Sequence, residues 1–195
     1  PFWVNQNLWH CIDKNQARKD LGLKEDEFIV GSFQRDTEGH DLKTPKLEKG
    51  PDIFCNIVEN LATKKENLSI LLSGFRRQYV IERLKRANIK YYYYEKTDFK
   101  TLNKLYNSLD LYIVSSRCEG GPQAIVESAI TKTPIISTDV GLAGTILSKK
   151  SIFSPPSPLG TPDVDYAYNC VSELVMPKGF NPFIDFFTNK LGGEK

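Results

Sequence analysis

The sequence lacks the features that mark membrane and nucleic-acid-binding proteins. Its 195 residues contain no apolar run of about eighteen residues, and its amino terminus does not resemble a secretory signal. The formal net charge is +2, which is too small to indicate a nucleic-acid partner. These absences predict a cytoplasmic protein that binds no nucleic acid.

Cysteine and histidine are scarce and poorly spaced for a metal site. The four cysteines lie far apart with no C-x-x-C spacing, and the two histidines form no H-x-x-x-H pattern. We therefore expect no zinc site, and we expect the cysteines to be reduced and mostly packed. The sequence also lacks a G-x-G-x-x-G turn after its first expected strand, which argues against a dinucleotide oxidoreductase.

What the sequence does contain is the alternation of strands and helices typical of an α/β domain. Hydrophobic residues make up 40% of the chain and no linker divides it, so we expect one domain over residues 1–195. The first residue is proline and the chain has one methionine, which favours a piece of a longer protein. Short apolar runs predict strands at 27–33, 68–72, 89–94, 109–114, 134–138 and 151–153. Helices are expected at 14–21, 52–63, 76–86, 102–109, 122–131, 142–147, 166–175 and 182–190.

The most informative stretch is VSSRCEGGPQAIVESAITKTPIISTDVG, residues 114–141. Pro122 suits the first position of a helix, because proline has no N–H to lose there. Glu127 falls on a helical face turned away from the apolar stripe. The free N–H groups of Gly120, Gly121 and the helix start would face the carboxyl ends of the strands, where open α/β sheets bind ligands. This predicts an anion-binding cradle.

Glu119 and Glu127 are eight residues apart, which resembles the E-x7-E motif of retaining glycosyltransferases with the GT-B fold, especially family 4 (glycosyl transferases group 1). SSRCEGGPQAIVESAITKTPIISTDVG is similar to that family's PS..EG.P....EA...G.PV...D.GG stretch, with Ser128 and Thr133 as departures. The resemblance implies a Rossmann-like parallel sheet flanked by helices, the C-terminal half of a GT-B fold. It also implies that the N-terminal acceptor domain is absent from this chain, and that no metal or other cofactor is used.

The resemblance implies a role for each candidate residue. Arg35 and Lys49 would bind the donor diphosphate, Glu127 the ribose hydroxyls, and Glu119 would border the donor sugar and act with the two cations in catalysis. Fixed cations stabilise a departing diphosphate, and a carboxylate offsets positive charge at the anomeric carbon. The other residues expected to bind the donor are Gly74, Tyr94, Glu95, Gly120, Gly121 and Pro122.

The lysine assignment leaves an alternative open. Fourteen positions separate Arg35 from Lys49, more than in the family, so Lys43 and Lys46 are also near enough in sequence to serve. We prefer Lys49, because Lys49 and Gly50 directly precede an expected helix as in the family motif. An arginine fork and an ammonium suit a diphosphate by charge alone. The competing interpretation is that these cations are solvated loop charges.

The sequence is consistent with three functions. The leading one is a domain that binds a nucleotide sugar and supports retaining transfer to a saccharide or lipid-linked acceptor in glycan or polysaccharide biosynthesis. The alternatives are a GT-B sugar-nucleotide 2-epimerase and a non-catalytic Rossmann-like module that binds a nucleotide or a partner. Peripheral membrane contact is a further alternative, through basic residues expected to point outward from the helix at 76–86. These are Arg76, Arg77, Arg83, Lys85 and Arg86. Alone, the chain is expected to bind donor weakly and to catalyse nothing.

Overall fold

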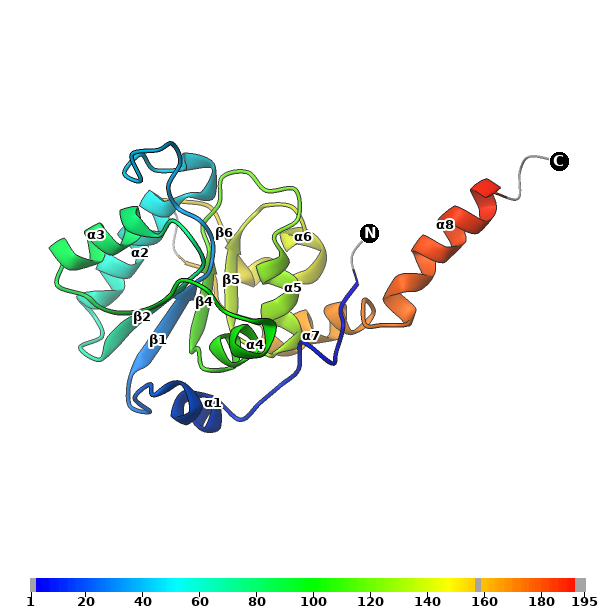
Figure 1. Cartoon of the computed structure of the whole chain (residues 1–195), viewed down its shortest axis with the longest axis horizontal. Coiled ribbons are helices and arrows are strands. Elements are labelled where there is room, and N and C mark those ends of the chain that lie inside the picture. The colour runs from blue at the N-terminus through cyan, green and yellow to red at the C-terminus, as the bar shows by residue number, and fades with distance from the viewer. Residues whose placement is uncertain (1–2, 157–158, 192–195) are drawn as a thin grey trace.

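The computed structural model describes residues 3–156 and 159–191, with side chains as far as Thr188, and these residues form a sheet with helices on both faces (Figure 1). The elements, in chain order, are α1 (Lys14–Leu21), β1 (Phe28–Ser32), η1 (Leu47–Lys49), α2 (Pro51–Ala62), β2 (Leu68–Ser73), α3 (Gln78–Arg86), β3 (Lys90–Tyr94), α4 (Phe99–Asn107), β4 (Leu111–Val114), α5 (Gln123–Ile130), β5 (Ile135–Thr138), α6 (Ala143–Ile146), η2 (Lys149–Ser151), β6 (Ile152–Phe153), α7 (Val164–Ser172), η3 (Lys178–Phe180) and α8 (Asn181–Leu191).

All six strands run parallel, in the order β3-β2-β1-β4-β5-β6. This is the Rossmann-like order, and it confirms the predicted fold class. The strand order reverses between β1 and β4, where Val30 pairs with Leu111. In sheets of this kind the crevice at the carboxyl ends of the strands, beside the reversal, is where ligands bind.

Both faces of the sheet are buried, which is why the strands are nearly continuous apolar runs. Successive residues alternate between two cores: Ile29 and Tyr112 contribute to one, and Val30 and Ile113 to the other. The first core also takes side chains from α4, α5 and α7, and the second from α2 and α3. Figure 1 shows α2 and α3 on one side of the sheet, opposite α4 and α5.

The predicted elements all form, with boundaries shifted by a few residues. The predicted glycine stop of α1 is also confirmed, since Gly22 adopts the left-handed conformation with φ +67°. Pro122 differs from expectation. It is the N-cap of α5, with ψ 114°, and the helix begins at Gln123. Because the chain is still extended at Pro122, the turn after β4 is one residue longer than the sequence pattern indicates.

Two expectations about burial were wrong. Arg77 was expected to point outward but is only 1% exposed, because its guanidinium pairs with Asp36 far away in the sequence. The cysteines were expected to be mostly packed, but Cys55 is fully buried while Cys11 and Cys118 are exposed. Burial raises the pKa of the Cys55 thiol to about 12.

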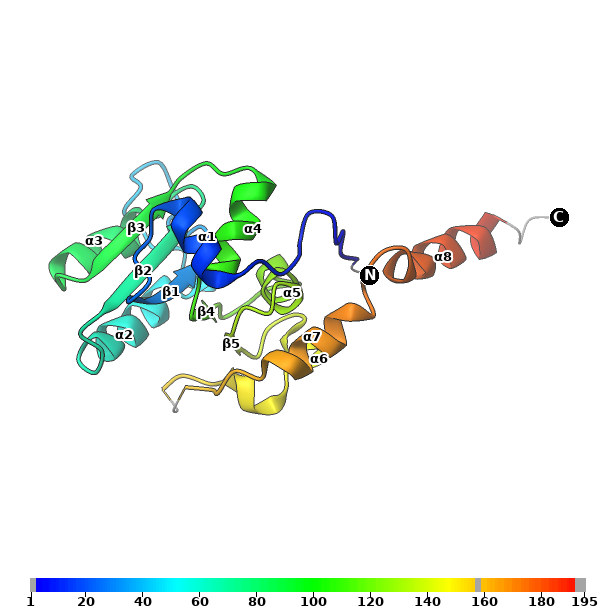
Figure 2. The same cartoon turned by 90° about the horizontal axis from the view of Figure 1, so that it is seen from below.

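The start of the described chain packs against the segment after α7 and against the start of α8. Val4 forms a β-bridge with Val175, and the Trp3 ring packs edge-on against Phe183 with ring centroids 4.7 Å apart. Helix α8 then projects away from the body of the domain in both views (Figures 1 and 2). In the part of the chain that the structure describes, no helix is long and apolar enough to cross a membrane.

Candidate functional site

A cavity of about 650 Å³ lies at the carboxyl ends of the strands, beside the reversal of strand order. This volume is in the range of about 300–1,000 Å³ typical of small-molecule sites. The segments that follow β1, β2, β3 and β4, together with α4 and the start of α5, form its wall. The lining residues are Phe33, Gln34, Lys49, Ser73, Gly74, Phe75, Glu95, Lys96, Thr97, Leu102, Tyr106, Tyr112, Glu119, Gly121, Pro122, Gln123, Ala124 and Glu127.

A cation and a carboxylate meet on this wall. Lys49, at the end of η1, forms an ion pair with Glu119, which follows β4. The Ser116 hydroxyl donates a further hydrogen bond to Glu119 Oε1 at 3.2 Å. The Lys49 side chain is 27% exposed and that of Glu119 13%, so both groups are partly shielded from solvent. Because solvent screens a partly shielded charge less, each of the two groups interacts more strongly with a charged atom placed beside it than a fully solvated charge would.

The backbone around Gly50 explains how Lys49 reaches the cavity. Gly50 has φ +60°, and a Cβ atom at this position would lie 1.9 Å from the Ser115 carbonyl oxygen. The Ser115 hydroxyl donates to the Gly50 carbonyl at 2.9 Å, and Gln34 Nε2 donates to the Lys49 carbonyl at 2.7 Å. Only glycine allows this close approach, so the Lys49-Gly50 pair in the sequence has a direct structural cause.

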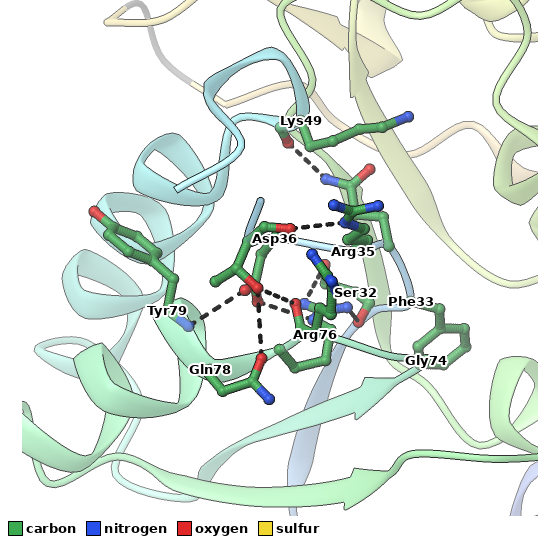
Figure 3. A network of polar contacts seen from close by, with 12 residues as sticks. Ser32, Phe33, Arg35, Asp36, Lys49, Gly74, Arg76, Gln78 and Tyr79 are labelled. Atoms are coloured by element: carbon green, nitrogen blue, oxygen red, sulfur yellow. Dashed lines mark hydrogen bonds and ion pairs between the residues drawn. The ribbon is translucent and has the colours of Figure 1, made fainter. Parts of the chain in front are cut away.

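A buried polar network anchors the long connection from β1 to α2 (Figure 3). The Asp36 and Arg77 side chains form an ion pair at 3.0 Å and are only 2% and 1% exposed. Arg77 also donates to the Ser32 carbonyl at 2.6 Å, at the end of β1, while the Tyr79 N–H donates to Asp36 at 3.3 Å. The Asp36 carbonyl accepts from the Lys46 N–H at 2.9 Å, just before η1. The network therefore ties the segment that carries Lys49 to the sheet and to α3.

As expected, Glu127 does not lie on the apolar face of α5, and its side chain lines the cavity. The Tyr106 hydroxyl donates to Glu127 Oε2 at 2.7 Å. Burial raises the pKa of the Glu127 carboxyl above its ordinary value, and the hydrogen bond from Tyr106 partly opposes that increase. The site thus holds a second carboxylate, enclosed by protein and close to a hydroxyl donor.

The family of this fold is identified by its sequence. The family described as "Glycosyl transferases group 1" matches residues 42–158, which is more than half of the chain. The chain belongs to the group 1 glycosyltransferases. The matched range contains Lys49, Glu119 and Glu127, so the family assignment covers the polar part of the cavity.

The chain is similar to parts of longer proteins. It is 26% identical over 138 residues to the lipopolysaccharide core biosynthesis mannosyltransferase LpsB of Rhizobium meliloti (strain 1021), a match that covers 67% of this chain and 36% of LpsB. A glycosyltransferase from Rickettsia africae ESF-5 has the same fold at TM-score 0.77 and 14% identity, over 99% of this chain and 57% of that one. Anabaena Alr3699/HepE, solved with UDP and glucose, superposes at TM-score 0.57 and 22% identity, over 87% and 45%. The chain spans about a third of LpsB.

The cavity brings together most of the predicted site residues. Those on its wall are Lys49, Gly74, Glu95, Glu119, Gly121, Pro122 and Glu127. Arg35, Tyr94 and Gly120 do not line it, and neither do Lys43 and Lys46. Arg35 is exposed, and its Nε donates to the Thr37 carbonyl at 2.7 Å. The Tyr94 hydroxyl donates to the Leu21 carbonyl at 3.0 Å, so this side chain packs toward α1 instead.

Sequence reasoning missed several residues that line the cavity, chiefly Phe75, Tyr106 and Tyr112. Tyr106 lies in an apolar stripe at helical spacing, and Tyr112 lies within a strand, so both read as core residues. Phe75 follows Gly74 in a turn and is 55% exposed. The signal available in the sequence was an aromatic residue just beyond the Ser73-Gly74 turn that ends an expected strand.

Within residues 3–156 and 159–191, no group of three or more His, Cys, Asp or Glu side chains is arranged to hold a metal ion. Glu119 instead has Lys49 as its charged partner. That no metal is used stays a prediction.

Proposed function

We propose that this chain is the C-terminal, donor-binding domain of a retaining, metal-independent glycosyltransferase. It binds a nucleotide-diphosphate sugar and supports transfer of the sugar to a saccharide or lipid-linked acceptor. The observation that carries the proposal is the convergence of Lys49, Glu119 and Glu127 on one cavity at the reversal of strand order. The acceptor domain lies outside this chain, in keeping with the 36% of LpsB that it spans.

The Lys49–Glu119 pair suits the leaving group and the sugar. A diphosphate carries about two negative charges and competes with Glu119 for the Lys49 ammonium through charge-assisted hydrogen bonds. Glu119 is then free to face the sugar, where its negative charge offsets the positive charge that develops at the anomeric carbon. The cation stabilises the departing diphosphate in the same step, so no metal ion is needed.

Arg35 is proposed as a second cation for the diphosphate. It follows β1 at the same edge of the sheet but does not line the cavity. Its guanidinium Nε bonds the Thr37 carbonyl at 2.7 Å, so contact with the donor requires that this bond be exchanged. Arg35 therefore contributes less to binding than Lys49, which already lies on the cavity wall.

Glu127 is proposed to bind the ribose. Its carboxylate has about four acceptor sites, and one of its oxygens already accepts from Tyr106. The remaining sites accept hydrogen bonds from two neighbouring hydroxyls. The ends of β2 and β3 supply Gly74, Phe75 and Glu95, which form the part of the wall proposed for the nucleobase.

The experiment that tests this function is calorimetric titration of the chain with UDP, GDP, ADP and NAD. We expect weak, saturable binding of one nucleoside diphosphate and none of NAD. Lys49→Met lowers the affinity by about tenfold, the size expected for one charge-assisted contact. The matched control Lys43→Met removes a lysine from the same connection that does not line the cavity, and leaves the affinity unchanged. Equal losses in both variants, or sugar transfer catalysed by this chain alone, contradict the proposal.

A further inference from the structure

Tyr106 is a phenol held rigidly inside the domain. It lies on α4 and is 1% exposed. Its ring packs edge-on against Phe33 and Trp9, with centroids 4.9 Å and 5.9 Å away, and at a tilt against Tyr112 at 5.3 Å. Three aromatic neighbours leave the ring little freedom, so the position of its hydroxyl is fixed before any ligand arrives.

The hydroxyl is directed at the carboxylate of Glu127. It donates to Glu127 Oε2 at 2.7 Å, and no other hydrogen bond to this carboxylate is found in the part of the chain that the structure describes. One acceptor site is therefore used, and the rest of the carboxylate is available to a ligand in the cavity. A buried phenol that only needed an acceptor would be served equally well by a backbone carbonyl, as Tyr94 is served by Leu21.

We infer that Tyr106 is a positioning residue of the donor site, whose hydroxyl holds the Glu127 carboxylate in the orientation and the ionised form that accept both ribose hydroxyls. This inference rests on the proposed function, because it assumes that a nucleotide ribose reaches Glu127. It adds to that function a residue that never needs to contact the donor sugar.

The electrostatics of the pair support the assignment. Burial raises the pKa of Glu127, and the bond from Tyr106 lowers it. Burial also raises the pKa of Tyr106 well above its ordinary value, with the Glu127 charge acting in the same direction, so the phenol stays a donor across the working pH range. Tyr112 faces the pair from β4. The charged side chains on the same cavity wall are Lys49, Glu95, Lys96 and Glu119.

Loss of the Tyr106 hydroxyl changes the protonation state of Glu127 that a ligand in the cavity contacts. Without the bond, the desolvated carboxylate holds its proton to a higher pH. A protonated carboxyl has one oxygen that donates instead of accepting, so it matches two ribose hydroxyls less well. Nucleotide binding by the altered chain should therefore weaken and should require a higher pH.

The test compares Tyr106→Phe with the matched control Tyr92→Phe, which removes a hydrogen bond from a half-buried phenol to the Glu27 carboxylate at 2.9 Å but lies off the cavity wall. The probe is whichever of UDP, GDP and ADP the unaltered chain binds, titrated between about pH 5 and pH 9. In parallel, the Glu127 pKa is followed by NMR on carboxyl-labelled protein without nucleotide.

We expect Tyr106→Phe to bind nucleotide about tenfold more weakly near neutral pH, with the midpoint of its pH profile raised by about one unit. The Glu127 pKa should rise with it, while Tyr92→Phe matches the unaltered chain in both respects. A purely structural tyrosine would lower the melting temperature without moving the pH midpoint, and that result overturns the inference while leaving the proposed function intact. If the unaltered chain binds none of the three nucleotides, the proposed function fails and the inference fails with it.

Discussion

The substitution Gly50→Ala tests how Lys49 is brought to the cavity. Gly50 has φ +60°, and an added Cβ would lie 1.9 Å from the oxygen and 2.8 Å from the carbon of the Ser115 carbonyl. Both contacts are to backbone, so no side chain can rotate away to relieve them. The loop after β4 or the start of α2 has to move, and the Ser115–Gly50 hydrogen bond at 2.9 Å breaks with it.

The expected loss in the free energy of unfolding is the sum of two costs. A non-glycine residue in the left-handed conformation costs roughly 1–2 kcal/mol, and forcing extra volume into a packed site costs roughly another 1–3 kcal/mol. Gly22→Ala is the matched control, because Gly22 has φ +67° but nothing lies within 4 Å of its added Cβ. Gly22→Ala therefore has only the cost of the left-handed backbone conformation. Gly50→Ala should therefore lose about 2 kcal/mol more, equivalent to a melting temperature about 4–8 °C lower than the control in a domain of this size.

The assay is thermal and urea unfolding of the two variants beside the unaltered chain. If Gly50→Ala melts at the same temperature as Gly22→Ala, the close contact with Ser115 is not a constraint and this explanation of the Lys49 position is refuted. Calorimetry adds a second readout. Gly50→Ala should weaken nucleotide binding, because the displaced backbone carries Lys49 away from Glu119, whereas Gly22→Ala should not.

Two further predictions concern buried charges. Arg77→Met leaves the Asp36 carboxylate buried without its partner, so the free energy of unfolding from urea titration should fall by roughly 3–5 kcal/mol, and a loss below about 1 kcal/mol would contradict the network. Glu127 has a raised pKa in the folded chain, so its contribution to stability is complete below its ordinary pKa and is lost as the pH rises through the raised value. Glu127→Gln should therefore melt at or above the temperature of the unaltered chain near neutral pH, with a flatter pH dependence, while it binds nucleotide more weakly. If the Glu127→Gln chain is less stable near neutral pH, the negative charge of Glu127 does not destabilise the folded chain and the reasoning is wrong.

The sheet could be predicted from the sequence because its signals are local. LSILL and LDLYIV are apolar runs of strand length, and the helices between them repeat apolar residues at a spacing of three to four. Lys49 could be chosen over its neighbours for a local reason as well. Gly50 follows it directly and α2 begins at the next residue.

The parts that were missed depend on contacts between distant segments. Arg77 lies in a run of basic residues that looks solvated, and only the fold brings Asp36 to it. Tyr106 is a core residue and a cavity residue at once, and its partner Glu127 is 21 positions away. Helical spacing predicts that Tyr106 is a core residue, but it does not indicate that Tyr106 also lines the cavity. That Arg35 binds phosphate stays a prediction, and in this structure its side chain donates to the Thr37 carbonyl.

The measurement that tests the central claim most directly is amide NMR of the labelled chain during titration with UDP, repeated with GDP and ADP. The account predicts saturable shifts with one of them, centred on Gly74, Glu95, Gly121 and Glu127 around the cavity. A second hollow, lined by Ile57 of α2 and Pro155, lies elsewhere on the domain and provides an internal control. Shifts confined to that hollow, or no shifts with any of the three nucleotides, would contradict the claim that this cavity binds the donor.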